Sequence, residues 1–240
     1  MKPLTWRKRI GLVTTSGQVV TEPRYNQIAP EGVTFHTARM LNKGGSLESL
    51  AEMEQNAPRA IDELTTAEVD AIAYCCTVSG ALRGIDEDRN FCTEVRDRTG
   101  IPTTSTMLAC VEALQHLNAL KVVLVSPYLH SHNEHEAEYL AAAGIHTVSM
   151  RGMNLTSGKQ YSRVPIDQIA QFSLDAWTDE ADAMLISCMN YDAIGAAEQI
   201  EQSIGKPVIT SHTATLWRVL SLAGVADRIP GVGRLLMENR

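Results

Sequence analysis

Short apolar runs alternate with amphipathic stretches along most of the chain. The apolar runs, rich in β-branched residues, lie at Ile10–Val13, Ala71–Tyr74, Lys121–Val125, Ala183–Ile186 and Val208–Thr210. The stretches with helical periodicity lie at Ser46–Thr65, Asp86–Arg98, His132–Ala143, Ile166–Ala176 and Ala193–Ser203. Continuous apolar strands that alternate with amphipathic helices are typical of parallel sheets covered by helices on both faces. The pattern therefore predicts an α/β fold.

The same pattern occurs twice. The segment Val69–Cys76 is echoed without a gap by Ala181–Cys188, and each copy places a cysteine six residues after an aspartate. Each copy then runs through a helix-like stretch to a Gly-x-Pro step, at Gly100–Pro102 and at Gly205–Pro207. The strands that open the two copies also resemble each other. We therefore expect two similar α/β lobes related by a pseudo-two-fold axis.

The duplication also suggests where the lobes divide and where a ligand binds. We predict that residues 1–117 together with 213–240 form the first lobe, closed by the C-terminal helix, and that residues 118–212 form the second. In open parallel sheets, ligands bind beyond the carboxyl ends of the strands. Backbone N–H groups at the helix starts that follow these strands can bind anions. We therefore expect the active site in the cleft between the lobes.

Composition and charge exclude several classes of protein. The chain has 240 residues, of which 44% are hydrophobic and 20% are charged, as in an ordinary globular protein. Its net charge of −7 argues against nucleic acid as a partner, because phosphate binding needs a concentrated basic surface. No apolar run approaches the roughly 18 residues of a membrane span, and none near the N-terminus is long enough for a signal peptide. We expect a cytoplasmic protein without a membrane partner.

The cysteines are the most informative candidate residues. Five is an odd number, which fits free thiols better than a disulfide framework. Cys76 and Cys188 lie at strand-to-helix junctions, where a helix N-terminus favours the thiolate, so we expect a lowered pKa and a nucleophile or base at each. Cys75 alternates with Cys76 on its strand and should face the other side. Cys92 and Cys110 lie inside helical patterns and are predicted to pack in the core.

The polar residues at the other strand ends complete the predicted site. The candidates for substrate binding are Thr15, Ser16, Gln18, Thr77, Val78, Tyr128, Met189 and Asn190. The histidine-rich segment His130–His135 matches no zinc spacing, so we predict a solvated helix start and no metal site. His212 is interpreted as a helix cap. Glycine spacings typical of phosphate or dinucleotide loops are missing, and so is the Gly-x-Ser-x-Gly motif of serine hydrolases.

With these residues in view, the chain resembles the aspartate/glutamate racemase superfamily. The resemblance is greatest to the branch that holds maleate cis–trans isomerase and arylmalonate decarboxylase. The segments that carry it are Arg9–Val13, Phe35–Met40, Tyr74–Val78, Ser126–Tyr128, and Ser187–Cys188 with Asp192–Ile194. The resemblance implies two flavodoxin-like lobes with four-stranded parallel sheets, no cofactor, and a homodimer or higher homo-oligomer. It also implies that Cys76 and Cys188 are the catalytic cysteines and that Tyr128 binds the substrate.

The chain departs from its relatives at two informative positions. The isomerases carry an asparagine that contacts a substrate carboxylate, and this chain has Gln18 in its place. Gln18 can still donate from its amide, but its extra methylene moves the donor. Arylmalonate decarboxylase has a glycine where this chain has Cys76, so the presence of both thiols favours isomerase or racemase chemistry.

The resemblance implies a mechanism for a small cis-dicarboxylate such as maleate. Cys76, as a thiolate, would add to one alkene carbon, the resulting single bond could rotate, and loss of the thiolate would give the trans alkene. Cys188 would act on the opposite face as proton donor and then acceptor. Thr77, Tyr128, Asn190 and backbone N–H groups after each cysteine are the candidate donors to the enediolate.

Three alternatives remain open, in descending order. A racemase of an amino acid or hydantoin would use both thiols as an acid/base pair, and the amino-acid version would need a carboxylate for the ammonium group, for which Glu22 is the nearest candidate. A decarboxylase would need only Cys188 beside an apolar pocket, although the aromatic content of 5% offers little for an aryl group. A small-molecule binding protein would not explain the matched thiols.

Overall fold

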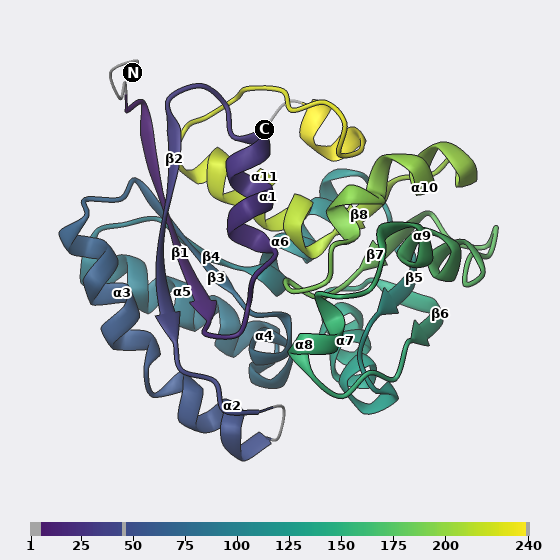
Figure 1. Cartoon of the computed structure of the whole chain (residues 1–240), viewed down its shortest axis with the longest axis horizontal. Coiled ribbons are helices and arrows are strands. Elements are labelled where there is room, and N and C mark those ends of the chain that lie inside the picture. Colours follow the sequence, from purple (N-terminus) through teal and green to yellow (C-terminus); the bar gives the residue numbers. More distant parts are fainter. Residues whose placement is uncertain (1–5, 45–46, 239–240) are drawn as a thin grey trace.

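Two parallel four-stranded sheets form the frame of the molecule (Figure 1). The structure is a computed structural model that describes residues 6–44 and 47–238. The strands of the first sheet are β1 (Lys8–Thr15), β2 (Val33–Met40), β3 (Ala71–Cys75) and β4 (Thr103–Ser105). Those of the second are β5 (Lys121–Ser126), β6 (His146–Gly152), β7 (Ala183–Ile186) and β8 (Val208–Thr210).

Both sheets have the same strand order. The order is β2-β1-β3-β4 in one and β6-β5-β7-β8 in the other, and every pairing is parallel. The predicted α/β class with two four-stranded parallel sheets is therefore confirmed. The repeated aspartates have a structural role in this duplication. Asp70 accepts a hydrogen bond from the N–H of Arg9 at 2.8 Å, and Asp182 accepts from the N–H groups of Leu120 and Lys121 at 3.0 and 2.9 Å.

Helices connect the strands and cover the sheets. Those between the strands of the first half are α1 (Thr21–Ile28), α2 (Leu47–Glu54), α3 (Ala57–Thr66), α4 (Thr77–Arg83), α5 (Ile85–Thr99) and α6 (Thr106–His116). Those of the second half are α7 (His130–Ala142), α8 (Gly158–Tyr161), α9 (Ile166–Leu174), α10 (Ala197–Ile204) and α11 (Ser211–Leu222). Short 3₁₀ helices lie at η1 (Ala193–Gly195) and η2 (Arg234–Met237). Among the described residues, no helix is both long and apolar enough to cross a membrane.

Two local predictions differ from the structure. The helix predicted over Ser46–Thr65, whose first residue lies outside the described part, is two helices that meet at Asn56. Pro58 stands in the first turn of α3 and has no N–H to continue the preceding helix. The pattern also missed β2 and β6, because these edge strands are only partly buried and their sequences mix polar with apolar residues.

One apolar core joins the two sheets. It contains Leu12 of β1 and Leu124 of β5 together with residues of α6 and α11. Helix α11 packs against α6, β3 and β4, beside the first sheet, although it follows β8 in sequence. In Figure 1, α6 and α11 lie between the two sheets. This packing is compatible with the predicted assignment of residues 213–240 to the first lobe, and the exact division into lobes stays a prediction.

Candidate active site

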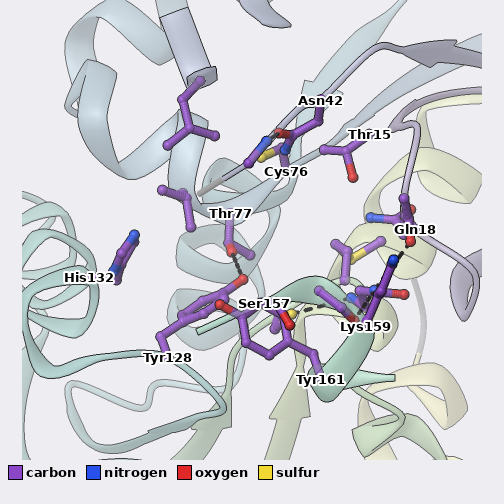
Figure 2. A pocket seen from close by; sticks show the side chains of 18 of the residues that line it. Thr15, Gln18, Asn42, Cys76, Thr77, Tyr128, His132, Ser157, Lys159 and Tyr161 are labelled. Carbon is purple, nitrogen blue, oxygen red and sulfur yellow. Dashed lines mark hydrogen bonds between the residues drawn. The ribbon is translucent and has the colours of Figure 1, made fainter. Parts of the chain in front are cut away.

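A cavity of about 460 Å³ lies beyond the carboxyl ends of the strands at the centres of the two sheets (Figure 2). This volume suits a small molecule. The first half of the chain lines it with Thr15, Gly17, Gln18, Asn42, Lys43, Gly44, Leu50, Cys75, Cys76, Thr77 and Val78. The second half lines it with Tyr128, His132, Thr156, Ser157, Gly158, Lys159, Tyr161, Cys188, Met189 and Asn190. The cavity is therefore shared between the two repeats.

Every predicted site residue except Ser16 lines this cavity. The Ser16 hydroxyl instead accepts a hydrogen bond from the N–H of Asn42 at 3.0 Å. It therefore holds the loop after β2, which brings Asn42 and Lys43 to the cavity. Cys75 touches the cavity, but its thiol lies in the core on the opposite face of β3 from Cys76, as the alternation predicts.

Cys76 lies at the N-cap of α4, directly after β3, with its side chain 8% exposed. The Ser79 hydroxyl donates a hydrogen bond to its sulfur at 3.1 Å. Burial and the negative charge of Glu54 raise the pKa of the thiol, whereas hydrogen bonds from Ser79 and the positive charge of Arg83 act against this rise. The expected lowering of the pKa is therefore wrong, because desolvation outweighs the helix N-terminus.

Cys188 follows β7 in a strained backbone conformation, with a φ of 110°. Non-glycine residues rarely adopt such angles, and they are found disproportionately at functional sites. The Ser211 hydroxyl and the Cys188 N–H form a hydrogen bond of 3.1 Å, and the N–H of Asn190 donates to the sulfur at 3.3 Å. Burial, together with the negative charges of Glu136 and Cys76, raises the pKa of Cys188 to about 12. For Cys188, as for Cys76, the expected lowering of the thiol pKa is therefore wrong.

The surroundings of the two thiols differ in charge. Charges of both signs act on Cys76: Glu54 raises the pKa of its thiol, and Arg83, which pairs with Glu54 and Asp88, lowers it. The charges that act on Cys188, those of Glu136 and Cys76, are both negative and raise its pKa. The charges therefore disfavour the anionic form less at Cys76 than at Cys188.

Tyr128 and Thr77 connect the two halves across the cavity. Their hydroxyl groups lie 2.9 Å apart (Figure 2). Tyr128 also lies close enough to Cys188 to lower the pKa of its thiol, and the Tyr128 ring meets that of Tyr161 edge to face, with centroids 5.4 Å apart. Burial raises the pKa of Tyr128 well above its usual value, which keeps its hydroxyl group protonated as a donor.

Two predicted substrate donors are already engaged in the protein. The side-chain amide of Asn190 accepts from the N–H of Val19 at 2.8 Å and donates to the carbonyl of Gly158 at 2.9 Å. The amide of Gln18 donates to the carbonyl of Cys75 at 3.1 Å, and its oxygen is buried without a partner among the described residues. The Asn190 side chain thus joins the segment after β1 to the start of α8 beside the cavity. Only the backbone N–H of Asn190 contacts a thiol, that of Cys188.

The residues that sequence reasoning missed carry the charge of the site. Lys43 and Lys159 are the charged side chains of the lining, and the lining that the structure describes contains no aspartate or glutamate. Lys43 pairs with Glu52 at 3.1 Å, whereas Lys159 makes no ion pair within the described part of the chain. Lys43 lies on the loop after β2 and Lys159 in the short helix α8, both far in sequence from the repeated cysteine segments, so only the spatial arrangement identifies them. An anionic ligand fits this lining.

Glu22 does not line the cavity and instead pairs with Arg39. The carboxylate that an amino-acid racemase would need is therefore missing at this position. His132, predicted to lie in a solvated helix start, in fact lines the cavity beside Tyr128, with ring centroids 5.8 Å apart. Within the described residues, no three His, Cys, Asp or Glu side chains are grouped to hold a metal ion.

The remaining cysteines and His212 lie in the interior. Cys92 and Cys110 are buried in the core, as predicted. The cap of α11 is Thr210 and not His212, so that interpretation is wrong. His212 is buried, and its Nε2 lies 3.3 Å from the Thr21 hydroxyl. Burial lowers the pKa of His212 to about 4, so it is neutral in the folded protein near neutral pH.

Comparisons with known proteins agree with this architecture. The model of the arylmalonate decarboxylase family matches residues 10–236. The maleate isomerase of Nocardia farcinica is 27% identical over 242 residues, which cover 97% of this chain and 96% of that protein.

Two solved structures are similar over nearly their whole length. A variant of the Nocardia farcinica maleate cis–trans isomerase with a covalently bound succinylcysteine intermediate has a TM-score of 0.91, at 28% identity, covering 97% of this chain and 99% of that one. A variant of the Pseudomonas putida S16 maleate isomerase with maleate also has a TM-score of 0.91, at 26% identity, covering 96% of this chain and 97% of that one. The chain belongs to the arylmalonate decarboxylase family, in the branch that also contains the maleate isomerases.

Proposed function

We propose that this protein catalyses the cis–trans isomerisation of maleate or a similar small cis-dicarboxylate without a cofactor. One observation carries the proposal: two buried cysteines from matching positions line one small cavity whose charged lining side chains are lysines. The paired thiols supply a nucleophile and an acid, and the lysines suit an anionic substrate. The protein's own charge of −7 would otherwise repel such a substrate.

The reaction begins with the Cys76 thiolate. Its sulfur forms a bond to one alkene carbon, and the alkene electron pair moves into the adjacent carboxylate to give an enediolate. The Cys188 thiol then donates its proton to the other former alkene carbon, which leaves a succinyl group on Cys76. Rotation about the new single bond follows. Cys188 takes the proton back, the carbon–sulfur bond breaks, and the trans alkene leaves.

Hydrogen-bond donors at the cavity would stabilise the enediolate. The N–H groups of Thr77 and Val78 lie in the first turn of α4, where they have no partner within the helix. The hydroxyl of Tyr128 and the ammonium group of Lys159 are the candidates on the opposite side. Such preorganised donors supply much of the rate enhancement when charge develops on a carboxylate.

A solved structure of a relative supports a reaction through a covalent bond to cysteine. The Nocardia farcinica maleate cis–trans isomerase carries a succinylcysteine intermediate in its solved structure. An amino-acid racemase is disfavoured here, because the described lining offers no carboxylate to an ammonium group.

Decarboxylation of an arylmalonate is the second candidate. The match to the decarboxylase family model favours it, and so do the apolar and aromatic side chains in the cavity lining, among them Leu50, Val78 and Tyr161. This reaction would need Cys188 as proton donor and would leave Cys76 without a role.

We retain three further expectations as proposals. The chain forms a homodimer or higher homo-oligomer in the cytoplasm, and its lobes divide near residues 117 and 212. Light scattering of the purified protein tests the oligomeric state.

The activity is tested by mixing the protein with maleate and following the vinyl proton signals by NMR. We expect fumarate to form, and we expect Cys76→Ser and Cys188→Ser to abolish its formation. Cys92→Ser, a change at a buried cysteine away from the cavity, is the control and should retain activity. If no fumarate forms but phenylmalonate releases CO2, the decarboxylase alternative replaces the proposal.

A further inference from the structure

The turn after β7 holds Cys188 in a backbone conformation that needs support from outside the turn. Cys188 has a φ of 110°, and a non-glycine residue keeps such an angle only where its surroundings hold it. The N–H of Asn190 donates to the Cys188 sulfur at 3.3 Å, and the N–H of Tyr191 donates to the Cys188 carbonyl at 3.4 Å. Both bonds join residues of the turn itself, so they do not fix the turn relative to the cavity. Contacts from other parts of the chain must do so.

The first half of the chain supplies such contacts through the segment that runs from the loop after β1 into α1. The Thr21 hydroxyl donates a hydrogen bond to the carbonyl of Met189 at 2.9 Å. The N–H of Val19 donates to Oδ1 of Asn190 at 2.8 Å. Met189 and Asn190 directly follow Cys188. The two residues after the strained cysteine are therefore tied to the opposite half of the molecule.

Arg24 of α1 fixes the far end of the turn. Its Nε and Nη2 donate to the two carboxylate oxygens of Asp192 at 2.8 and 2.5 Å. Such a pair of parallel bonds sets the orientation of the carboxylate as well as its position. A Cβ at Gly195 would lie 3.2 Å from Nη2 of Arg24, so the guanidinium packs closely on η1, which follows Asp192. Arg24 therefore holds both the end of the turn and the start of η1.

The contacts of α1 with α11 direct the Thr21 hydroxyl towards the turn. Thr21 is buried, and its oxygen also lies 3.3 Å from Nε2 of His212. Because the hydroxyl has one proton and gives it to Met189, it accepts from His212, whose Nε2 carries the hydrogen. The Tyr25 hydroxyl donates to the His212 carbonyl at 2.8 Å, so α1 lies against the start of α11 (Figure 1). The neutral imidazole thus keeps the Thr21 proton on the Met189 carbonyl.

We propose that Thr21 and Arg24 are positioning residues, which hold the strained turn from the opposite half of the chain and so keep the Cys188 sulfur at the cavity. Neither residue lines the cavity, so both act through Cys188 and not on the substrate. In the isomerisation, which this inference takes from the proposed function, they keep the Cys188 thiol in place to donate its proton and take it back.

The first test measures the reactivity of Cys188 and needs no substrate. In a Cys76→Ser background, modification of Cys188 by methyl methanethiosulfonate is followed by peptide mass spectrometry. Thr21→Val keeps the shape of the side chain but removes the hydroxyl. It should raise the rate about tenfold, because loss of a buried hydrogen bond lets the strained turn relax and expose the sulfur. Thr21→Ser keeps the hydroxyl and should keep the parent rate. Cys92 and Cys110, buried in the core, report opening of the whole fold and should not react faster.

Two further variants test the second contact and the specificity of the effect. Arg24→Lys keeps the positive charge but cannot place two parallel N–H groups on the carboxylate, so it too should speed the modification of Cys188. Because Arg24 is partly exposed, this variant keeps the proposal testable if Thr21→Val does not fold. Thr99→Val is the matched control. It removes a hydroxyl that donates to the Val95 carbonyl at 2.7 Å at the end of α5, and it should leave the rate unchanged.

The outcomes that would overturn the proposal are equally definite. One is a rate for Thr21→Val no higher than that of the parent. Another is an equal rise in Thr21→Ser or Thr99→Val, or at the two core cysteines, because a loosened fold would then explain the effect.

Steady-state kinetics on maleate give a second readout in the protein with Cys76 intact. Thr21→Val should lower kcat about tenfold and leave KM unchanged, because the turn holds the group that moves the proton and not a group that binds the substrate. A higher KM at unchanged kcat would overturn the proposal. If the wild-type protein does not convert maleate, the proposed function fails, whereas the thiol measurement still decides whether Thr21 and Arg24 position Cys188.

Discussion

The hydroxyl group of Thr77 lies 2.9 Å from that of Tyr128, and this contact spans the cavity between the two repeats. Thr77 starts α4 directly after Cys76, and Tyr128 lies close enough to Cys188 to lower the pKa of its thiol. The hydrogen bond between Thr77 and Tyr128 therefore joins the surroundings of two thiols that come from different sheets. A small substrate between them would meet a nucleophile on one side and a proton donor on the other.

The first prediction concerns Lys159, which lines the cavity without an ion pair in the described part of the chain. Lys159→Gln should raise the KM for maleate about fivefold and change kcat less, because a partly solvated charge pair is worth about 1 kcal/mol in binding. The effect should shrink as salt is added.

Lys206→Gln, at an exposed position beyond α10, is the matched control for the loss of one positive charge. A KM for Lys159→Gln equal to that of this control would show that the cation does not bind the substrate carboxylate. Steady-state kinetics at two salt concentrations distinguish these outcomes.

The second prediction concerns Gly152 at the end of β6. A Cβ at this position would collide with the carbonyl oxygen of Tyr128 and would lie 2.7 Å from Nδ2 of Asn133. Gly152→Ala should therefore lower the free energy of unfolding by about 2 kcal/mol, as overpacking of a core does, and should displace Tyr128. At Gly44 an added methyl group would make only ordinary contact with the side chain of Ser49, so Gly44→Ala serves as the control in urea unfolding. Equal stability of the two variants would contradict the prediction.

The third prediction concerns the pH dependence of stability. The pKa of Glu136 rises from its ordinary value of 4.5 to about 7 in the folded protein. Between these values the folded state holds a proton that the unfolded state has lost, so stability falls as pH rises through this range. Glu136→Gln should remove this loss, and its stability relative to wild type should rise by about 3 kcal/mol from acidic to neutral pH.

His212 changes the pH dependence of stability in the direction opposite to that of Glu136. Its pKa falls from 6.5 to about 4 on folding, so the unfolded state binds the extra proton and stability falls as pH drops through this range. His212→Gln should therefore gain stability relative to wild type as the pH is lowered. Urea unfolding at several pH values, with Glu134→Gln as control, measures both effects. Profiles parallel to wild type would show that the two groups do not titrate as stated.

The sequence alone predicts the central strands and the cysteine pair because these depend on local pattern. β3 and β7 are fully buried, so their apolar runs are continuous, and Cys76 and Cys188 are found from the repeat itself. The edge strands β2 and β6 could not be predicted in this way, because their partial burial leaves a mixed pattern.

The remaining features of the site depend on tertiary structure. Lys159 reaches the cavity from the short helix α8, and Glu136 of α7 is brought next to Cys188 by its hydrogen bond with Ser187. Neither lies in a motif. The raised pKa values of the thiols were also not foreseen, because desolvation depends on how deeply the finished fold buries each sulfur.

The central claim is that Cys76 forms a covalent bond with the substrate and that Cys188 moves the proton. Cys188→Ser should therefore slow removal of the proton from the adduct more than it slows addition. The direct measurement is mass spectrometry of this variant after incubation with maleate, followed by peptide mapping. The account predicts a mass increase of one maleic acid, located on Cys76 and missing from the Cys76→Ser, Cys188→Ser double variant. An unmodified protein, or an adduct on Cys75, Cys92 or Cys110, would contradict it.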